Sequence, residues 1–257
     1  MLRFACLGSG SEGNALVVHG QSGLLPTRIL VDNGFGPRLL EQRLARVGLA
    51  FDDLDAIIVT HEHSDHAGGV AALLKRRPMP VFATAGTARA ARLQDSPHWH
   101  RIEAAMPITL GELWVLPFAV PHDAEEPVQF VFSDGDRRLG LLTDIGEPTL
   151  DVAAALAGVH ALLLECNHDA DMLRTGNYPE NLKTRIRGNR GHLSNAQAAQ
   201  LLGLVERGAL NFIAAAHLSR RNNRPELARA ALADVLRCAH ADVAIADQDL
   251  GLDWIDA

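Results

Sequence analysis

Short runs of apolar residues alternate along the chain with longer segments in which apolar residues recur every three or four positions. The short runs predict β-strands at 2–7, 14–19, 28–32, 55–60, 113–120, 127–133, 138–143, 159–165, 211–216 and 242–246. The helical spacing predicts helices at 37–47, 64–76, 85–93, 148–157, 194–206 and 225–239. Several strands of the first half are close enough to form antiparallel hairpins. The pattern therefore favours an α/β fold with a pair of mixed sheets and helices outside, rather than a regular βαβ winding.

Composition narrows the class of protein. The 257 residues are 47% hydrophobic, and we expect one domain over 1–257 because neither a repeat nor a linker interrupts them. No apolar run approaches the roughly 20 residues that span a bilayer, and the first residues lack a signal-peptide core. The three scattered cysteines fit reduced thiols. We expect a cytoplasmic protein without a membrane partner, and the sequence leaves its oligomeric state open.

The charge of the chain limits its interaction with nucleic acid to a local surface. The net charge is −7 and aromatic residues are 5%, which excludes a surface covered with phosphate-binding charge and an extended base-stacking platform. A local basic groove remains compatible with these values. Twelve histidines are the anomaly of the composition, and several of them lie in tight polar clusters.

Polar residues follow the ends of several predicted strands. Asp32, His61, Asp144 and His217 each come directly after an apolar run or within two residues of its end. Strand ends in α/β proteins are where loops converge to build sites. Each of these residues alone would be an ordinary turn, cap or polar residue. Their joint occurrence predicts one shared site.

The strongest chemical signal is the segment 60–69, THEHSDHAGG. His61, His63, Asp65 and His66 fall within six residues at a predicted strand-to-helix turn. Alternate residues leaving a strand point the same way, so His61 and His63 can share one ion, and Asp65 and His66 can face a second. Imidazole and carboxylate ligands suit zinc or another first-row divalent metal. A histidine-rich solvated turn is the alternative, and this density of ligands argues against it.

This segment resembles the HxHxDH signature of the metallo-β-lactamase superfamily, and the remaining positions of that family occur in order. The resemblance implies a four-layer αββα sandwich with two divalent metal ions, Zn²⁺ or Mn²⁺. It implies that His61, His63 and His122 hold the first metal, that Asp65, His66 and His217 hold the second, and that Asp144 bridges them. Asp32 would support the ligand turn from behind.

The flanking motifs resemble the YycJ/WalJ-like branch of this superfamily. They are LGSGSEGN at 7–14, PHDA at 121–124, ECNHD at 165–169, GHLSN at 191–195, and HLS at 217–219 with Asn222 and Asn223. Glu12 is a charged residue where a small one is expected in this branch, but every ligand position is intact. The resemblance implies a 5′-to-3′ exonuclease that acts on double-stranded DNA. It touches His168 without assigning that residue a role.

A second catalytic group and a substrate surface are expected near residue 190. Gly191-His192-Leu193-Ser194 resembles the loop of tRNase Z-like phosphodiesterases whose histidine assists cleavage; alternatively Ser194 only caps a helix. Basic residues precede this loop, and with Asn223 they are candidate substrate contacts: Lys183, Arg185, Arg187 and Arg190. A solvated helical face would also explain this cluster.

The implied mechanism is hydrolysis of a phosphodiester. Water held between two cations has its pKa lowered to about 7, so that hydroxide oriented by Asp65 would attack phosphorus in line. His192 would stabilise the transition state or protonate the leaving oxygen. Asp144 and His217 are too close in sequence for the long insertion of β-CASP RNA nucleases. The substrate could instead be a small phosphodiester, a thioester or a lactone. In a different class, the chain could be a metal-binding regulatory protein without turnover.

Overall fold

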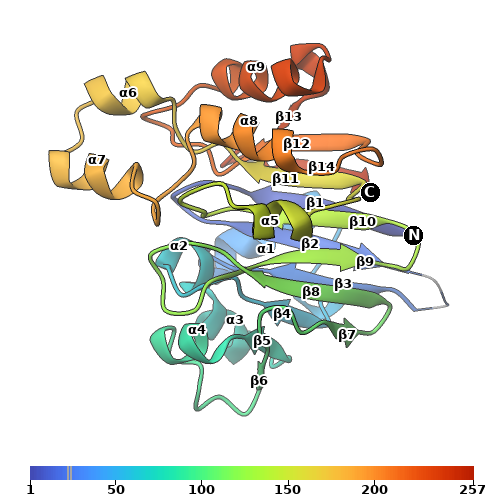
Figure 1. Cartoon of the computed structure of the whole chain (residues 1–257). Helices are drawn as coiled ribbons and strands as arrows, with labels where there is room; N and C mark the ends of the chain where they lie inside the picture. Colours follow the sequence, from blue (N-terminus) through green and yellow to red (C-terminus); the bar gives the residue numbers. More distant parts are fainter. Residues whose placement is uncertain (22, 24) are drawn as a thin grey trace.

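Two sheets pack face to face between two layers of helices in the computed structural model, which describes residues 1–21, 23 and 25–257 (Figure 1). Among these residues each sheet has seven strands. The first sheet has the order β14 (Leu252–Asp256), β1 (Leu2–Gly8), β2 (Ala15–Gly20), β3 (Thr27–Val31), β4 (Ala56–Ile58), β5 (Val81–Ala83) and β6 (Trp99–Arg101). The second sheet has the order β13 (Ala244–Ile245), β12 (Phe212–Ala216), β11 (Ala161–Glu165), β10 (Arg138–Leu142), β9 (Val128–Ser133), β8 (Leu113–Ala119) and β7 (Ile108–Leu110).

Both sheets are mixed in the same way. In the first, the pairs from β14 to β3 are antiparallel and those from β3 to β6 are parallel. In the second, the pairs from β7 to β10 are antiparallel and those from β10 to β13 are parallel. Parallel neighbours need a crossover connection, and helices provide it here. The loops at the carboxyl ends of β3, β4, β10, β11 and β12 carry most of the predicted site residues.

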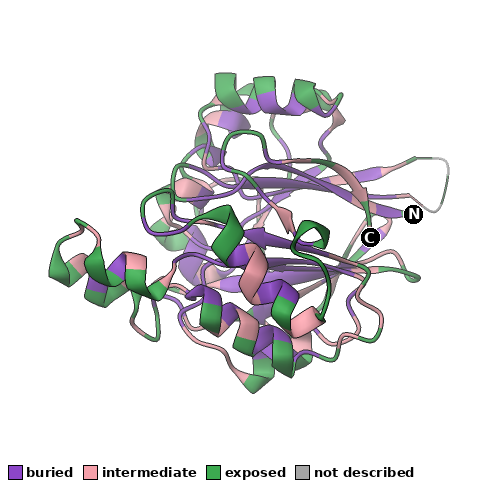
Figure 2. Ribbon diagram, turned by 90° about the horizontal axis from the view of Figure 1, so that it is seen from above, coloured by how far each residue is buried: buried purple, intermediate pink, exposed green. Residues whose placement is uncertain are grey.

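Helices cover the outer face of each sheet. The first sheet is covered by α1 (Pro37–Arg46), α3 (Val70–Arg76) and α4 (Ala85–Ala90), and the short α2 (Ser64–Ala67) precedes α3. The second sheet is covered by α5 (Leu150–Ala155), α8 (Asn195–Leu204) and α9 (Pro225–Leu236). Two further helices, α6 (Ala170–Thr175) and α7 (Glu180–Ile186), project from the sandwich in both views (Figures 1 and 2). Single 3₁₀ turns occur at Phe51–Asp53 and His240–Asp242.

The buried apolar side chains form three cores: one between the two sheets and one between each sheet and its helices. Successive side chains of a strand point alternately into two of these cores. In β1, Leu2, Phe4 and Cys6 pack in the core between the sheets, whereas Ala5 and Leu7 pack under the first helical layer. Both faces of such a strand are buried, which is why its sequence is apolar throughout rather than alternating. In Figure 2 the strands are accordingly coloured as buried along most of their length.

The second sheet repeats this division. In β11, Leu163 belongs to the core between the sheets, and Leu162 and Leu164 pack against the second helical layer. Every one of these leucines is at most 1% exposed. The predicted α/β sandwich with two mixed sheets and outer helices is therefore confirmed.

The predicted elements are found, with some omissions. All ten predicted strands and all six predicted helical segments have a counterpart, but β5, β6, β7, β14, α6 and α7 were not expected. The predicted helix 64–76 is divided into α2 and α3 at Gly68 and Gly69. A Cβ atom on Gly69 would collide with the carbonyl oxygen of Phe35, because the ligand turn lies directly against the loop after β3. Among the described residues, no helix is long and apolar enough to cross a membrane.

Candidate metal centre

Three of the predicted site residues adopt a left-handed backbone within two residues of the end of a strand. Their φ angles are 59° for Asp32 after β3, 53° for Asp144 after β10 and 54° for His217 after β12. Positive φ is uncommon for residues other than glycine, although aspartate and histidine tolerate it better than most. Such positions gather where the surrounding structure fixes a functional side chain. Here each of the three side chains reaches the histidines of the predicted site.

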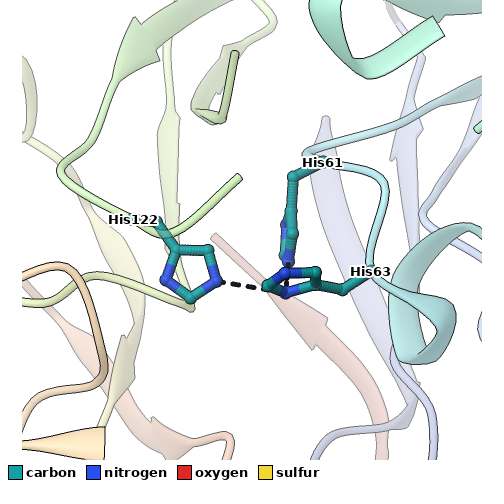
Figure 3. A group of neighbouring side chains, drawn as sticks. All are labelled: His61, His63 and His122. Carbon is teal, nitrogen blue, oxygen red and sulfur yellow. Dashed lines mark hydrogen bonds between the residues drawn. The ribbon is translucent and has the colours of Figure 1, made fainter. Parts of the chain in front are cut away.

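Three histidines face one another through their ring nitrogens (Figure 3). His61 Nε2 lies 3.1 Å from His63 Nδ1, and His122 Nε2 lies 3.3 Å from the same His63 atom. His61 follows β4, His63 precedes α2 and His122 lies in the loop after β8, so the two sheets contribute to one cluster. Three converging imidazole nitrogens form a ligand set for zinc or a related cation.

A second cluster lies beside the first. Oδ2 of Asp65 is 3.5 Å from Nε2 of His66 and 3.5 Å from Nε2 of His217. Asp144 lies between the clusters: its Oδ2 is 3.0 Å from His66 Nε2, and its Oδ1 is 3.9 Å from His122 Nε2. The structure thus brings together all seven residues predicted as ligands, with Asp144 in contact with both groups.

Asp32 and Thr60 fix the rings of His66 and His61 from behind. The carboxylate of Asp32 accepts hydrogen bonds from the Thr60 hydroxyl (2.8 Å), the Thr60 backbone N–H (2.8 Å) and His66 Nδ1 (2.7 Å). The Thr60 oxygen is then free to accept from His61 Nδ1 at 3.0 Å. With the proton on Nδ1, both rings turn the lone pair of Nε2 into the cluster, which is how outer partners orient histidine ligands.

His122 and His217 are oriented in the same way. Nδ1 of His122 donates to the carbonyl oxygen of Gly191 at 3.0 Å, and Nδ1 of His217 lies 3.2 Å from Oε1 of Glu165. A carbonyl and a carboxylate can only accept, so Nδ1 carries the proton of each neutral ring and the lone pair of Nε2 faces the cluster. Nε2 of His217 and Oδ2 of Asp144 are buried and form no hydrogen bond with any described residue. Ligand atoms left in this state fit a bound cation.

The electrostatics of the two clusters differ. Burial lowers the pKa of His61 well below its ordinary value and also lowers that of His122, so these imidazoles are neutral. Burial acts in the same sense on His66 and His217, but the neighbouring carboxylates outweigh it. They raise the pKa of His66 well above its ordinary value and that of His217 to about 10. Asp144 contributes most to this effect in both. The second cluster therefore stabilises positive charge, as a cation site does.

Glu165 is a buried carboxylate at the end of β11 to which the sequence assigned no role. Its Oε2 accepts from the backbone N–H groups of Ile145 (3.0 Å) and Leu193 (3.1 Å), and its Oε1 lies 2.8 Å from Nδ1 of His192 as well as close to His217. Burial raises the pKa of such a group, but its histidine partners hold the pKa of Glu165 at about 2. Glu165 joins the loop of Asp144 to both histidines. Only the motif at 165–169 pointed to it.

His192 lies beside the two clusters, with its ring centroid 5.3 Å from that of His122 and 5.3 Å from that of His217. Its side chain is 22% exposed, so the ring has access to the cavity above the ligands. Ser194 caps α8 by accepting a hydrogen bond from the N–H of Gln197 at 3.2 Å. Ser194 thus caps a helix, and His192 lines the cavity over the ligands; a catalytic role for His192 stays a prediction.

A cavity of about 380 Å³ opens over the clusters. Asp65, Asp144, His192 and His217 line it, and so do hydroxyl groups and part of the α6–α7 segment. Its volume lies in the range of small-molecule sites. Of the five candidate substrate contacts, Arg185 lines this cavity and forms an ion pair with Asp123 at the rim.

The other four candidate contacts are directed elsewhere. The Lys183 ammonium is buried and bonds to Glu180 (2.9 Å) and the Arg174 carbonyl (3.0 Å), and Arg190 donates to the His122 carbonyl at 2.9 and 3.1 Å. Asn223 is buried and pairs with Asn195 and the Cys166 carbonyl. Arg187 is exposed and bonds to Thr184. Substrate contact by these residues stays a prediction.

Comparison with known proteins agrees with this geometry. Residues 27–213 match the model of the Beta-lactamase superfamily domain. The chain is 36% identical over 239 residues to "Exodeoxyribonuclease YycJ" of Bacillus anthracis, covering 91% of this chain and 89% of that protein. It is 33% identical over 249 residues to "Exodeoxyribonuclease WalJ" of Streptococcus pneumoniae, covering 95% and 90%.

Solved structures agree on the fold. The metallo-β-lactamase fold protein YhfI of Bacillus subtilis superimposes with a TM-score of 0.75 at 18% identity, over 100% of this chain and 99% of that chain. The short form of human tRNase Z superimposes with a TM-score of 0.64 at 16% identity, over 99% and 98%. The predicted metal-dependent hydrolase is confirmed by the family and its relatives. The chain therefore belongs to the metallo-β-lactamase superfamily, within its YycJ/WalJ-like branch.

Proposed function

We propose that the chain is a dinuclear metal-dependent phosphodiesterase that degrades double-stranded DNA as a 5′-to-3′ exonuclease. The observation that carries this proposal is the complete set of seven ligands beside His192 at the floor of one cavity. The names of the relatives that align over about nine-tenths of the chain support DNA as the substrate. The proposal assigns His61, His63 and His122 to one cation, and Asp65, His66 and His217 to the other, with Asp144 shared.

The donor set determines what the bound ions contribute. Two divalent cations, Zn²⁺ or Mn²⁺, would supply an acidified water molecule and neutralise charge on the phosphate oxygens. Asp65 is half-buried, and the His217 and His66 side chains keep its pKa below the ordinary value despite that burial. It is therefore a carboxylate at neutral pH. It can accept a hydrogen bond from the attacking water and orient it toward phosphorus.

His192 is suited to protonate the leaving oxygen. Burial lowers the pKa of this histidine, but the Glu165 carboxylate outweighs burial and raises it above the ordinary value. The carboxylate thus favours the protonated form of the ring. Because Nδ1 is engaged by Glu165, the proton available to substrate is the one on Nε2. General acid catalysis of this kind contributes about 10²- to 10⁴-fold to a rate.

A small phosphodiester is a second candidate substrate. The cavity volume of about 380 Å³ suits a molecule of nucleotide size, and most of the neighbouring basic side chains are engaged by protein groups. The surface therefore offers the phosphates of a long duplex fewer free basic side chains than the sequence indicates. This candidate shares the chemistry of the first and differs in the extent of the substrate.

One experiment separates these candidates. The purified protein with Mn²⁺ is incubated with a 5′-labelled duplex and, separately, with a small chromogenic phosphodiester; His192→Ala serves as the variant. We expect digestion of the duplex from its 5′ end and its loss in His192→Ala at unchanged metal content. Hydrolysis of the small diester alone would overturn DNA as the substrate. Inactivity on both by metal-loaded protein would overturn the phosphodiesterase proposal.

A further inference from the structure

The α6–α7 segment contributes an apolar wall to the cavity. Tyr178, in the connection between α6 and α7, and Leu182 and Ile186, one turn apart on α7, all line it. Leu182 and Ile186 are at positions i and i+4 and so lie on one face of the helix. Each of the three side chains is half-buried, and none belongs to the three cores of the sandwich. Their apolar surface is directed to the cavity and is not part of the packing that holds the fold.

This wall is fixed in position although the segment projects from the sandwich. The carbonyl of Ile186 accepts a hydrogen bond from the backbone N–H of His192 at 2.8 Å, so the end of α7 is joined to the loop that carries His192. The ion pair between Arg185 and Asp123 joins it to the loop of His122. The buried ammonium of Lys183 holds α7 to the end of α6. Three separate links therefore keep the apolar side chains beside the metal ligands.

The aromatic ring of the wall also has a cation near it. Tyr178 is the single tyrosine of the chain, and the guanidinium carbon of Arg221 lies 5.7 Å from its ring centroid. This distance is within the range of a cation–π contact and restrains the ring. A held aromatic side chain loses little conformational freedom when a flat ligand stacks on it.

The remaining walls of the cavity are polar. Ser11, Ser64 and Ser219 line it together with the carboxylates and imidazoles of the floor. A phosphate group belongs at this floor, beside the metal ligands and His192. The group that the phosphate carries must then lie within a few ångströms of it, and one apolar, aromatic surface is available there. A nucleobase has the flat apolar faces that match such a surface, and stacking on aromatic side chains is tolerant of base identity.

We propose that Tyr178, Leu182 and Ile186 form a nucleobase subsite, on which the base of the nucleotide attached to the reacting phosphate packs. This inference rests on the proposed function, because it identifies the reacting phosphate as that of a nucleotide. It assigns to the α6–α7 segment the role of holding the terminal nucleotide while the sandwich supplies the chemistry. Tyr178 touches substrate in this account, whereas Arg185 and Lys183 position the wall.

The first test measures binding without turnover. Calorimetry of the metal-loaded protein compares the affinity for thymidine 5′-monophosphate with that for inorganic phosphate. We expect the wild type to prefer the nucleotide by about 5- to 30-fold, the lower part of what base–aromatic stacking contributes. Tyr178→Ala should lose most of this preference, and Tyr178→Phe should keep it. Leu150→Ala removes an apolar side chain that is 73% exposed on α5, and it serves as the control outside the cavity.

The second test measures cleavage of duplexes whose 5′-terminal nucleotide is either intact or abasic. The wild type should cleave the intact end with the higher kcat/KM, and Tyr178→Ala should bring the two values together. Equal losses on both ends, or an unchanged nucleotide preference in Tyr178→Ala, would overturn the subsite. If wild-type protein prefers the nucleotide in binding but degrades no DNA, the nuclease proposal fails and the subsite stands. If the wild-type protein degrades DNA but binds the nucleotide no more tightly than phosphate, the subsite fails and the nuclease proposal stands.

Discussion

Replacement of Glu165 by glutamine tests the link between the metal ligands and the proposed acid. The carboxylate accepts from His192 and His217 through one oxygen and from the backbone of Ile145 and Leu193 through the other. A glutamine of the same shape can keep its oxygen on the two backbone N–H groups. Its NH₂ group then faces the two histidine Nδ1 atoms, where the carboxylate accepted hydrogen bonds.

The consequence is a change of tautomer in both rings. Two donors cannot face each other, so each Nδ1 must give up its proton, and neutral His217 then carries a proton on the Nε2 that faces the metal. Loss of such an outer partner typically costs 10- to 100-fold in metal affinity, about 1.4 to 2.8 kcal/mol. His192 also loses the carboxylate that raises its pKa and so favours its protonated form. We therefore expect kcat to fall by about 10²- to 10⁴-fold even when metal is saturating.

The assay combines metal binding by calorimetry with kcat on a small phosphodiester at saturating metal. Glu41→Gln, on the exposed surface of α1, is the matched control and should leave both quantities unchanged. The double variant Glu165→Gln, His192→Ala should be little slower than either single variant, because the two residues act as one unit. Wild-type metal affinity and kcat in Glu165→Gln would refute the assignment of tautomers.

Two further changes test the support of the site. Asp32→Asn weakens three hydrogen bonds behind the ligand turn, so metal affinity should fall by about 10- to 100-fold; calorimetry with unchanged affinity would contradict this. Burial lowers the pKa of His168 to about 4 from an ordinary 6.5, so neutral His168 contributes stability above pH 6.5 that is lost as the pH falls toward 4. The difference in unfolding free energy between wild type and His168→Gln should therefore shift by about 2 to 3 kcal/mol against the wild type between pH 7.5 and pH 4.5. A pH-independent difference in denaturant titrations would contradict this.

The ligand cluster was predictable because its information is local. His61, His63, Asp65 and His66 are separated by at most five positions, and Asp32, Asp144 and His217 each follow an apolar run. The sequence gives no sign, however, that the last three adopt a left-handed backbone. Partners far along the chain hold it in place: the Asp32 N–H donates to the Ile58 carbonyl, and the His217 N–H donates to the Ser9 hydroxyl.

Apart from β14, which has five residues, the missed elements are too short to show a period. Strands β5, β6 and β7 have three residues each, and helices α6 and α7 have six and seven. A helical period needs a window of about 11 to 18 residues to stand out. As a result, the sequence of the segment that forms one wall of the cavity shows its basic residues but not its two helices.

The roles of Glu165 and Lys183 could not be predicted because they depend on side-chain partners that only the folded structure shows. Glu165 contacts His192 and His217, which lie 27 and 52 positions further along the chain, and an acidic residue at the end of a strand has no local mark of that role. The basic cluster shows the reverse case. Lys183 reads as a free cation in the sequence, but its ammonium bonds to Glu180 and to the Arg174 carbonyl within the same segment.

The measurement that tests the central claim most directly is a metal titration of metal-free protein, with bound metal and duplex cleavage recorded at each addition. We predict that two equivalents of Mn²⁺ or Zn²⁺ bind and that cleavage of a 5′-labelled duplex reaches its full rate only after the second. Full cleavage with one equivalent or none would contradict the dinuclear site. Two bound equivalents without cleavage of DNA would contradict the exonuclease.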